Sequence, residues 1–400
     1  MQAEAVQTSP SFRHFAPAMR LYYGEDSLES LRPELERSGV KRVVVFCGRS
    51  LSQHPQGLTH IARHLGTLHA GSFMEVASHS PLPAIIAGRD MLRETRADAV
   101  LALGGGSAIV TARGATILLG EDRPIEALVT RFAPGQPPRS PRLQASKLPQ
   151  FIVPTTPTTA IAKAGTAVLE PGTGRRLTML DPRTRAQAIF VDPRLALATP
   201  VAVVRDAALN AFAMAIQGLE SHTRQPLADA SLLEAVRLLR DNLPRLGTSA
   251  DGADVRGALL LAAVLTGQGT DQTSCGLTSA LGHCIGARHH TANGTVNAVL
   301  LPHVIRFNGP ATGERLAAVA AMLGGDEAGQ METADADAAA RACAGFFARL
   351  GSPSRLSDIG IEAAAFEPIL ADVEEDWFFH QNPRRVESPQ QVRDILQAAL

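Results

Sequence analysis

The chain has 400 residues, 45% of them hydrophobic, which is enough to bury the core of one large or two ordinary domains. Its formal net charge of −1 argues against nucleic acid or an anionic membrane as a partner. No apolar run approaches the roughly 20 residues that cross a bilayer, and the first residues lack the apolar core of a signal peptide, so we expect a cytoplasmic protein. The four cysteines are far apart and form no CxxC pair, which favours buried free thiols over a zinc or redox site.

Short apolar runs alternate with helical patterns in the first half of the chain. They predict strands at 19–24, 43–46, 73–76, 97–103 and 151–153. Spaced leucines predict a helix that Ser27 caps and Gly39 ends, and a later helix covers 84–96. This alternation is typical of a parallel, doubly wound sheet. Residues 132–150, rich in Pro, Ser and Arg, predict an exposed loop. Strands of a hairpin region are expected at 166–169, 176–180 and 188–191.

The character of the sequence changes after residue 200. From Val201 onward, periodic apolar residues, abundant alanine and helix stop signals predominate, which predicts an all-helical region. We therefore expect an α/β nucleotide-binding domain over 1–200, followed by an all-α substrate domain over 201–400.

The strand at 97–103 runs directly into Gly104, Gly105, Gly106 and Ser107, and small apolar residues at helical spacing follow. Glycines let the backbone approach an anion closely, while the free N–H groups and the dipole of the helix start favour negative charge. The pattern predicts a phosphate-binding turn. The alternative is a tight strand-to-helix connection that binds no ligand.

Two further segments follow strands and carry candidate cofactor contacts. Gly48, Arg49 and Ser50 follow the strand at 43–46, where a nucleotide-binding fold commonly places an acidic residue on the ribose 2′-hydroxyl. The sequence has no acidic residue there. Gly48 therefore leaves room for a 2′-phosphate, and Arg49 suits it. The alternative is that Arg49 is a solvated loop arginine. The hydroxyl-rich segment 154–159 suits phosphate oxygens or a nicotinamide amide.

The order and spacing of several short motifs resemble the iron-containing alcohol dehydrogenase family, and within it the maleylacetate reductases. The resemblance covers nearly the whole chain. Its motifs are Tyr23 with Gly24, residues 79–81 (His-Ser-Pro), 104–107, 154–156, 192–193, 210–211 with 229–230, 282–286, 297–303 with 306–308, and 382–384.

The resemblance implies a Rossmann-like domain and a helical domain in the dehydroquinate synthase-like arrangement, with NAD or NADP and a small substrate in the cleft between them. It implies that Gly104 to Ser107 hold the pyrophosphate. The hydroxyls of Thr155, Thr156 and Thr159 would line the cofactor, and Arg176 stands where the family usually has a lysine that touches it. A homodimer in which N-terminal strands meet is also implied.

The metal site of the family is altered in this sequence. Family members that use iron or zinc bind it with one aspartate and three histidines, whose positions fall here at Asn210, Met214, Ser279 and Asn293. Four neutral side chains do not supply the charge and imidazole nitrogens that a catalytic divalent metal needs. We therefore predict that no metal is bound.

Without a Lewis acid, other groups must stabilise and protonate the developing alkoxide. The resemblance makes His283 the first candidate, the alternative being a core histidine bonded to backbone. Asn210 and Asn293 are candidates for hydrogen bonds to the oxyanion. The acidic run 374–376 is interpreted as a solvated face, and residues 377–380 as part of the helical core.

The sequence thus predicts an oxidoreductase that transfers hydride between NAD(P) and a small carbonyl or alcohol without a metal, in the manner of a maleylacetate reductase. Two alternatives stay open. One is a metal-dependent alcohol dehydrogenase. The other is a catalytically silent nucleotide-binding protein, which is favoured by departures from the family pattern at Val110, Ile161 and Ala162.

Overall fold

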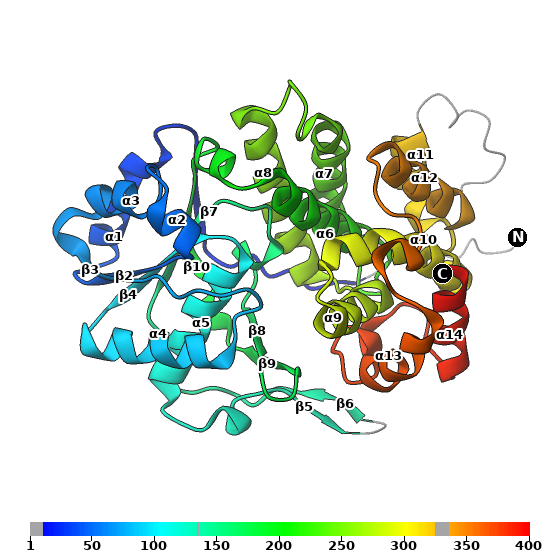
Figure 1. Ribbon diagram of the computed structural model, residues 1–400, viewed down its shortest axis with the longest axis horizontal. Helices are drawn as coiled ribbons and strands as arrows, with labels where there is room; N and C mark the ends of the chain where they lie inside the picture. Colours follow the sequence, from blue (N-terminus) through cyan, green and yellow to red (C-terminus); the bar gives the residue numbers. More distant parts are fainter. Residues whose placement is uncertain (1–10, 134–135, 325–335) are drawn as a thin grey trace, which may run out of the picture.

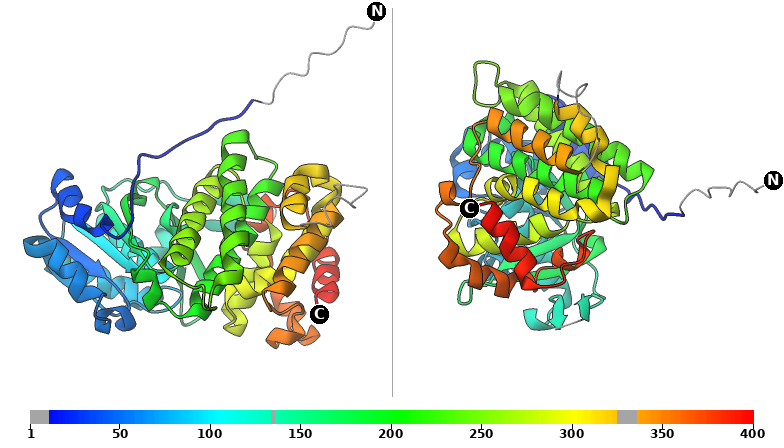
Figure 2. Two further views of the ribbon diagram at one scale, coloured as in Figure 1. Left: turned by 90° about the horizontal axis from the view of Figure 1, so that it is seen from above. Right: turned by 90° about the vertical axis from the view of Figure 1, so that its right-hand side faces the viewer.

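The computed structural model describes residues 11–133, 136–324 and 336–400. A parallel six-stranded sheet fills one half of the molecule, and helices fill the other (Figures 1 and 2). In spatial order, the strands of the sheet are β1 (Arg20–Tyr23), β10 (Ala186–Val191), β7 (Gln150–Pro154), β4 (Ala99–Gly104), β2 (Val43–Phe46) and β3 (His69–Phe73).

Helices cover both faces of this sheet because its central strands carry apolar side chains on both sides. Val43 and Val45 face one cluster, which includes residues of α1 (Leu31–Arg37) and α3 (Leu58–Leu65). Val44 and Phe46 face the opposite cluster, with α4 and α5. The other helices from the first half of the chain are α2 (Arg49–Gln53), α4 (Leu82–Glu94) and α5 (Gly106–Glu121).

The helical half begins with α6. A short turn separates this helix from the last strand of the sheet, which ends at Val191. Its core includes Phe212, whose ring centroid lies 5.1 Å from that of Phe346 and 5.3 Å from that of Phe347. The helices are α6 (Val201–Glu220), α7 (Pro226–Asn242), α8 (Ala253–Gln272), α9 (Leu277–His289), α10 (Asn293–Thr312), α11 (Ala317–Gly324), α12 (Ala336–Arg349), α13 (Phe366–Val373) and α14 (Pro389–Ala398). The division into domains 1–200 and 201–400 stays a prediction.

Among the described residues, no helix combines the length and hydropathy needed to cross a membrane. A cytoplasmic location stays a prediction.

Several predicted elements differ from the structure. The third strand lies at His69–Phe73, not at 73–76, because its pairing with β2 aligns His69 with Val43 and Phe73 with Phe46. Ser27 does not cap a helix: it starts a 3-10 turn that precedes α1, and its hydroxyl makes no hydrogen bond within the described chain.

The predicted loop at 132–150 contains an antiparallel pair, β5 (Arg131–Ala133) and β6 (Gln136–Arg139). Prolines suit such an isolated edge strand. A proline has no backbone N–H to donate, and an edge strand has one side on which no donor is needed. Only two of the three expected hairpin strands form a hairpin, namely β8 (Gly165–Leu169) and β9 (Arg176–Leu180). The third, 188–191, lies inside the parallel sheet as part of β10.

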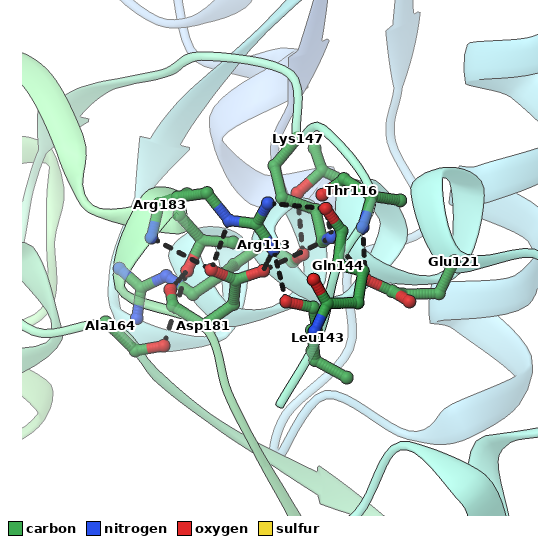
Figure 3. Close-up of polar contacts among 11 residues, drawn as sticks. Arg113, Thr116, Glu121, Leu143, Gln144, Lys147, Ala164, Asp181 and Arg183 are labelled. Atoms are coloured by element: carbon green, nitrogen blue, oxygen red, sulfur yellow. Dashed lines mark hydrogen bonds and ion pairs between the residues drawn. The ribbon is translucent and has the colours of Figure 1, made fainter. Parts of the chain in front are cut away.

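A buried ion cluster attaches the segment before β7 to the rest of the α/β half (Figure 3). The ammonium of Lys147 lies 2.7 Å from Glu121 Oε1 and 3.2 Å from Asp181 Oδ2, and these three side chains are at most 4% exposed. Arg183 also pairs with Asp181, at 2.8 Å. Since Glu121 ends α5 and Asp181 follows β9, the cluster fixes the hairpin that carries Arg176 against the helix of the glycine turn.

Candidate functional site

A cleft of about 1870 Å³ lies between the carboxyl ends of the central strands and the helical half. This is where a ligand binds in an open parallel sheet. The structure brings most of the predicted site residues together on its walls. They are Gly48, Gly104, Gly105, Gly106, Ser107, Thr155, Thr156, Thr159, Arg176, Asn210, Met214, His283 and Asn293.

Arg49 and Ser279 are not among the residues that line the cleft. Gly48 precedes the short helix α2, Arg49 is its first residue, and Ser50 and His54 face the cleft in its place. Ser279 is buried inside the helical half.

The glycine turn has the geometry of a phosphate cradle. Gly104 has φ +134°, a conformation that side-chain-bearing residues rarely adopt, and α5 begins at Gly106 with no side chain capping its N-terminus. A Cβ on Gly105 would lie 2.7 Å from Oγ1 of Thr156. The bare backbone and free helix N-terminus at this wall therefore fit the pyrophosphate of a dinucleotide.

The side chains at two of the family metal positions bond to each other and to the opposite wall. Met214 Sδ accepts hydrogen bonds from Asn210 Nδ2 at 3.5 Å and from Thr159 Oγ1 at 3.4 Å. The Asn210 carbonyl accepts one from Asn297 Nδ2 at 2.9 Å. This thioether and amide network links α6 to the threonine segment after β7.

The third position, Ser279, is held by Gln217 of α6. The Gln217 amide donates to the Ser279 hydroxyl at 3.0 Å and accepts from the backbone N–H groups of Gly276 and Ser279, each at 3.0 Å. Gln217 thereby caps the start of α9. Neither its amide nor the Ser279 hydroxyl is left to bind an ion.

The fourth position, Asn293, begins α10, and the nearby carboxylate of Asp206 is committed to capping that helix. Asp206 Oδ1 accepts from the N–H of Thr295 at 2.8 Å, and burial raises its pKa. Within the part of the chain that the structure describes, no three His, Cys, Asp or Glu side chains are grouped to hold a metal. The donor set therefore does not fit the iron that the family name implies.

His283 of α9 faces the cleft and is oriented by a carboxylate. Its Nδ1 lies 2.8 Å from Asp376 Oδ2. Because an ionised carboxylate only accepts hydrogen bonds, Nδ1 carries the proton, and Nε2 is the nitrogen able to take up or release one. The other oxygen, Asp376 Oδ1, accepts from the N–H of Phe378 at 2.9 Å, so the carboxylate is itself fixed.

This arrangement corrects the interpretation of residues 374–380. Asp376 is not part of a solvated face, since its side chain is 17% exposed and bonded to His283. Trp377 and Phe378 line the cleft instead of lying wholly in the helical core. The reason is that α13 ends at Val373, and the segment after it brings Asp376 to His283 of α9.

The charges around His283 determine its protonation. Burial lowers the pKa of His283, and the positive charges of Arg176 and Lys163 lower it further, while Asp376 opposes them. Burial alone would raise the pKa of Asp376, but the charge and hydrogen bond of His283 hold it below its ordinary value. The pair therefore consists of a carboxylate and a mainly neutral imidazole at neutral pH.

Further basic side chains line the same cleft and come from both halves. His79 precedes α4, Arg176 begins β9, and His290 follows α9. His79 and His290 adopt left-handed backbone conformations, with φ of 62° and 54°. The pKa of His79 is lowered by burial, and Arg176 and His290 lower it further.

Sequence reasoning missed Asp376 and Lys163, and it noted His79 only as part of a motif. The position of Asp376, six residues before the 382–384 motif, was the one available signal.

Comparisons with known proteins identify the family of the chain. Residues 18–193 match the model of iron-containing alcohol dehydrogenase, and residues 205–400 match that of the C-terminal part of the Fe-containing alcohol dehydrogenase family. The chain is 28% identical to the maleylacetate reductase of Rhizobium sp. (strain MTP-10005) over 96% of both chains. It is 30% identical to maleylacetate reductase 2 of Cupriavidus pinatubonensis, over 78% of this chain and 77% of that one.

The crystal structure of maleylacetate reductase from Agrobacterium tumefaciens has the same fold, with a TM-score of 0.80 at 26% identity. The match covers 98% of this chain and 99% of that chain. The chain belongs to the iron-containing alcohol dehydrogenase family, within which it is an oxidoreductase similar to the maleylacetate reductases.

Proposed function

We propose that the protein reduces a small carbonyl compound with NADH or NADPH and needs no bound metal. The observation that carries this proposal is the His283–Asp376 pair at 2.8 Å, which faces a cleft whose metal positions hold four neutral side chains. An imidazole positioned by a carboxylate is a proton donor and acceptor that requires no Lewis acid.

The glycine turn supports the cofactor part of the proposal. Residues Gly104 to Ser107 would hold the pyrophosphate, and Thr155, Thr156 and Thr159 would line the rest of the dinucleotide. When bound, the nicotinamide ring supplies or accepts the hydride. Gly48 and Ser50, with no acidic side chain at 47–50, suit a 2′-phosphate and favour NADPH.

The protein's own part in the chemistry is proton transfer. As hydride adds to the carbonyl carbon, the carbonyl π electrons move to oxygen, and this oxygen takes a proton from Nε2 of His283. Asp376 stabilises the imidazolium that precedes transfer, and the reverse reaction returns the proton to Nε2. Asn210 and Asn293, on the facing helices, are proposed as polar contacts to the same oxygen.

The basic groups at the cleft support an acidic substrate. Arg176 makes no ion pair within residues 11–133, 136–324 and 336–400, and it lines the cleft together with His79 and His290. A guanidinium with two imidazoles fits a carboxylate better than an uncharged group. We therefore propose a keto acid or aldehyde acid, of which maleylacetate is one example.

The first test is metal analysis of purified protein followed by NADH and NADPH titration with nicotinamide fluorescence. We expect less than stoichiometric iron and zinc, binding of NADPH, and turnover of keto acids that survives chelation. Activity that disappears on chelation and returns with iron or zinc would instead support a metal-dependent dehydrogenase. Binding without turnover of any aldehyde, ketone or keto acid would support a catalytically silent nucleotide-binding protein.

We also propose a homodimer. Strand β1 pairs with β10 on one side only and stands at the edge of the sheet, so its other side is available to pair with the same strand of a second copy. Light scattering of the purified protein should give twice the mass of the 42.2 kDa chain. A monomer at micromolar concentration would contradict this proposal.

A further inference from the structure

Lys163 is an unusual residue in this chain. Of the 38 lysines and arginines, only three are lysines. Lys41 is exposed at the surface, and the side chain of Lys147 is fully buried with two carboxylates. Lys163 is partly buried and lines the cleft, just after the 3-10 turn Thr159–Ile161 that follows the threonine segment.

The ammonium of Lys163 and the imidazole of the proposed proton donor, His283, both lie near the ring of Phe378. Its Nζ is 5.9 Å from the ring centroid of Phe378, and that centroid is 5.7 Å from the ring centroid of His283. Its positive charge adds to the lowering of the pKa of His283 by burial and by Arg176, and it opposes the rise that burial causes in the pKa of Cys275. The thiol of Cys275 in turn interacts with the hydroxyl of Ser279.

Lys163 lines the same cleft as His283 and as three of the four family metal positions, Asn210, Met214 and Asn293. At two of these positions neutral side chains, Asn210 and Met214, replace the aspartate and the first histidine of the family. In the described parts of the chain, no acidic side chain forms an ion pair with Lys163. Its charge is therefore not neutralised by a partner and acts on whatever occupies the cleft.

We propose that Lys163 is a catalytic residue whose ammonium stabilises the oxyanion forming on the substrate carbonyl, where the family uses a metal ion. The proposal rests on the proposed function, since it requires hydride transfer without a metal. Lys163 keeps its proton throughout, and the proton that ends on the substrate oxygen comes from His283. A fixed positive charge aimed at a developing oxyanion acts mainly on the transition state, so it raises kcat more than it tightens binding.

The test compares Lys163→Met, Lys163→Arg and the surface control Lys41→Met on two substrates of similar size, glycolaldehyde and glyoxylate. Methionine keeps the length of the side chain but removes the charge. We expect Lys163→Met to lower kcat by about 100-fold to 1,000-fold on both substrates, as the loss of one oxyanion-stabilising group does elsewhere. NADPH affinity should change little, arginine should restore part of kcat, and Lys41→Met should match the wild type.

Two outcomes would overturn the proposal. The first is a Lys163→Met variant that keeps its kcat. The second is a loss confined to the KM of glyoxylate, which would make Lys163 a binding group for the substrate carboxylate. Restoration of wild-type activity by added iron or zinc after chelation would instead refute the metal-free function itself, so the two failures are distinguishable.

Chemical labelling of the wild-type protein tests the position of Lys163 even if the variant does not fold. Reductive methylation followed by mass spectrometry should modify Lys41 and Lys163 and spare Lys147. NADPH together with isobutyramide, a carbonyl analogue that accepts no hydride, should protect Lys163 but not Lys41. Equal labelling of Lys163 with and without these ligands would overturn the proposal.

Discussion

The carboxylate of Asp376 and the imidazole of His283 are 93 residues apart in the sequence and meet at 2.8 Å on the wall of the cleft. Asp376 fixes the tautomer of the ring, because its oxygens accept the proton of Nδ1. Arg176 acts in the opposite sense on the same ring, since its charge disfavours the imidazolium. Protonation of His283 is therefore set by residues from both halves of the protein.

The first prediction concerns the pH dependence of alcohol oxidation, in which neutral Nε2 takes up the proton. The rate falls once the ring is protonated, and the pKa of His283 is lowered from 6.5. We expect the acidic limb of kcat/KM below pH 6.5. Asp376→Asn should move the limb to still lower pH, because it removes a group that raises the pKa of His283. Arg176→Gln should move the limb to higher pH, because it removes a charge that lowers this pKa. Limbs unchanged in both variants would contradict this assignment.

The second prediction tests the phosphate cradle. In Gly105→Ala the new Cβ would lie 2.7 Å from Oγ1 of Thr156, so one wall of the turn must move. We expect NADPH binding, measured by fluorescence, to weaken at least about tenfold, equivalent to about 1.4 kcal/mol. Gly172→Ala is the matched control, since nothing lies within 4 Å of a Cβ there. Equal affinities in the two variants would argue against pyrophosphate binding at this turn.

Periodicity and glycine chemistry predicted much of the fold. The apolar runs at 43–46 and 97–103 became buried central strands because both faces of a parallel sheet need apolar residues. The strand after α3 was predicted at 73–76 and lies at His69–Phe73. The prediction missed its start because Gly71 and Ser72 interrupt its apolar pattern. The hairpin β5 and β6 was missed because its prolines are a strong loop signal.

The candidate site was predicted less completely, for a physical reason. The residues of the glycine turn are consecutive in the sequence, so they can be recognised as one motif. Asp376 lies in an acidic run, and only the end of α13 at Val373 turns this carboxylate inward. The surroundings of Lys163 likewise include Phe378, which contacts His283, and both residues come from the other half of the chain. Periodicity carries no information about such long-range approaches.

The third prediction concerns Lys147, which neutralises two buried carboxylates. In Lys147→Met, Glu121 and Asp181 would stay buried without their shared cation, and Arg183 would pair with only one of them. Removing one partner of a buried ion pair costs about 3–5 kcal/mol. We expect a loss of this size in the free energy of urea unfolding, with Lys41→Met unchanged. A loss below about 1 kcal/mol, the range of exposed pairs, would show that water reaches the cluster.

The fourth prediction concerns Glu220, a fully buried carboxyl group at the end of α6. Its Oε2 lies 3.4 Å from the donor Asn308 Nδ2, and its Oε1 has no hydrogen-bond partner among the described residues. Burial raises its pKa from 4.5 to about 8. Between these values the folded protein holds a proton that the unfolded chain has released.

This difference sets the sign of the pH dependence. Because the folded state binds the extra proton, the free energy of unfolding should fall as pH rises from about 4.5 to about 8 and level off above it, with a slope of up to about 1.4 kcal/mol per pH unit from this group. Glu220→Gln, which keeps the shape and cannot ionise, should remove this contribution. Its melting temperature should exceed that of the wild type by a margin that grows towards pH 8.

The matched control is Glu234→Gln, because the side chain of Glu234 is 44% exposed and pairs with Arg237. Its pKa is lowered by that arginine, so its contribution to stability is lost as pH falls through the acidic range and is constant between pH 5 and 8. If Glu220→Gln and Glu234→Gln show parallel melting curves across this range, Glu220 is ionised in the folded protein. Its charge would then have to be balanced by Arg315, whose guanidinium already donates to the backbone carbonyl of Glu220 at 2.7 Å.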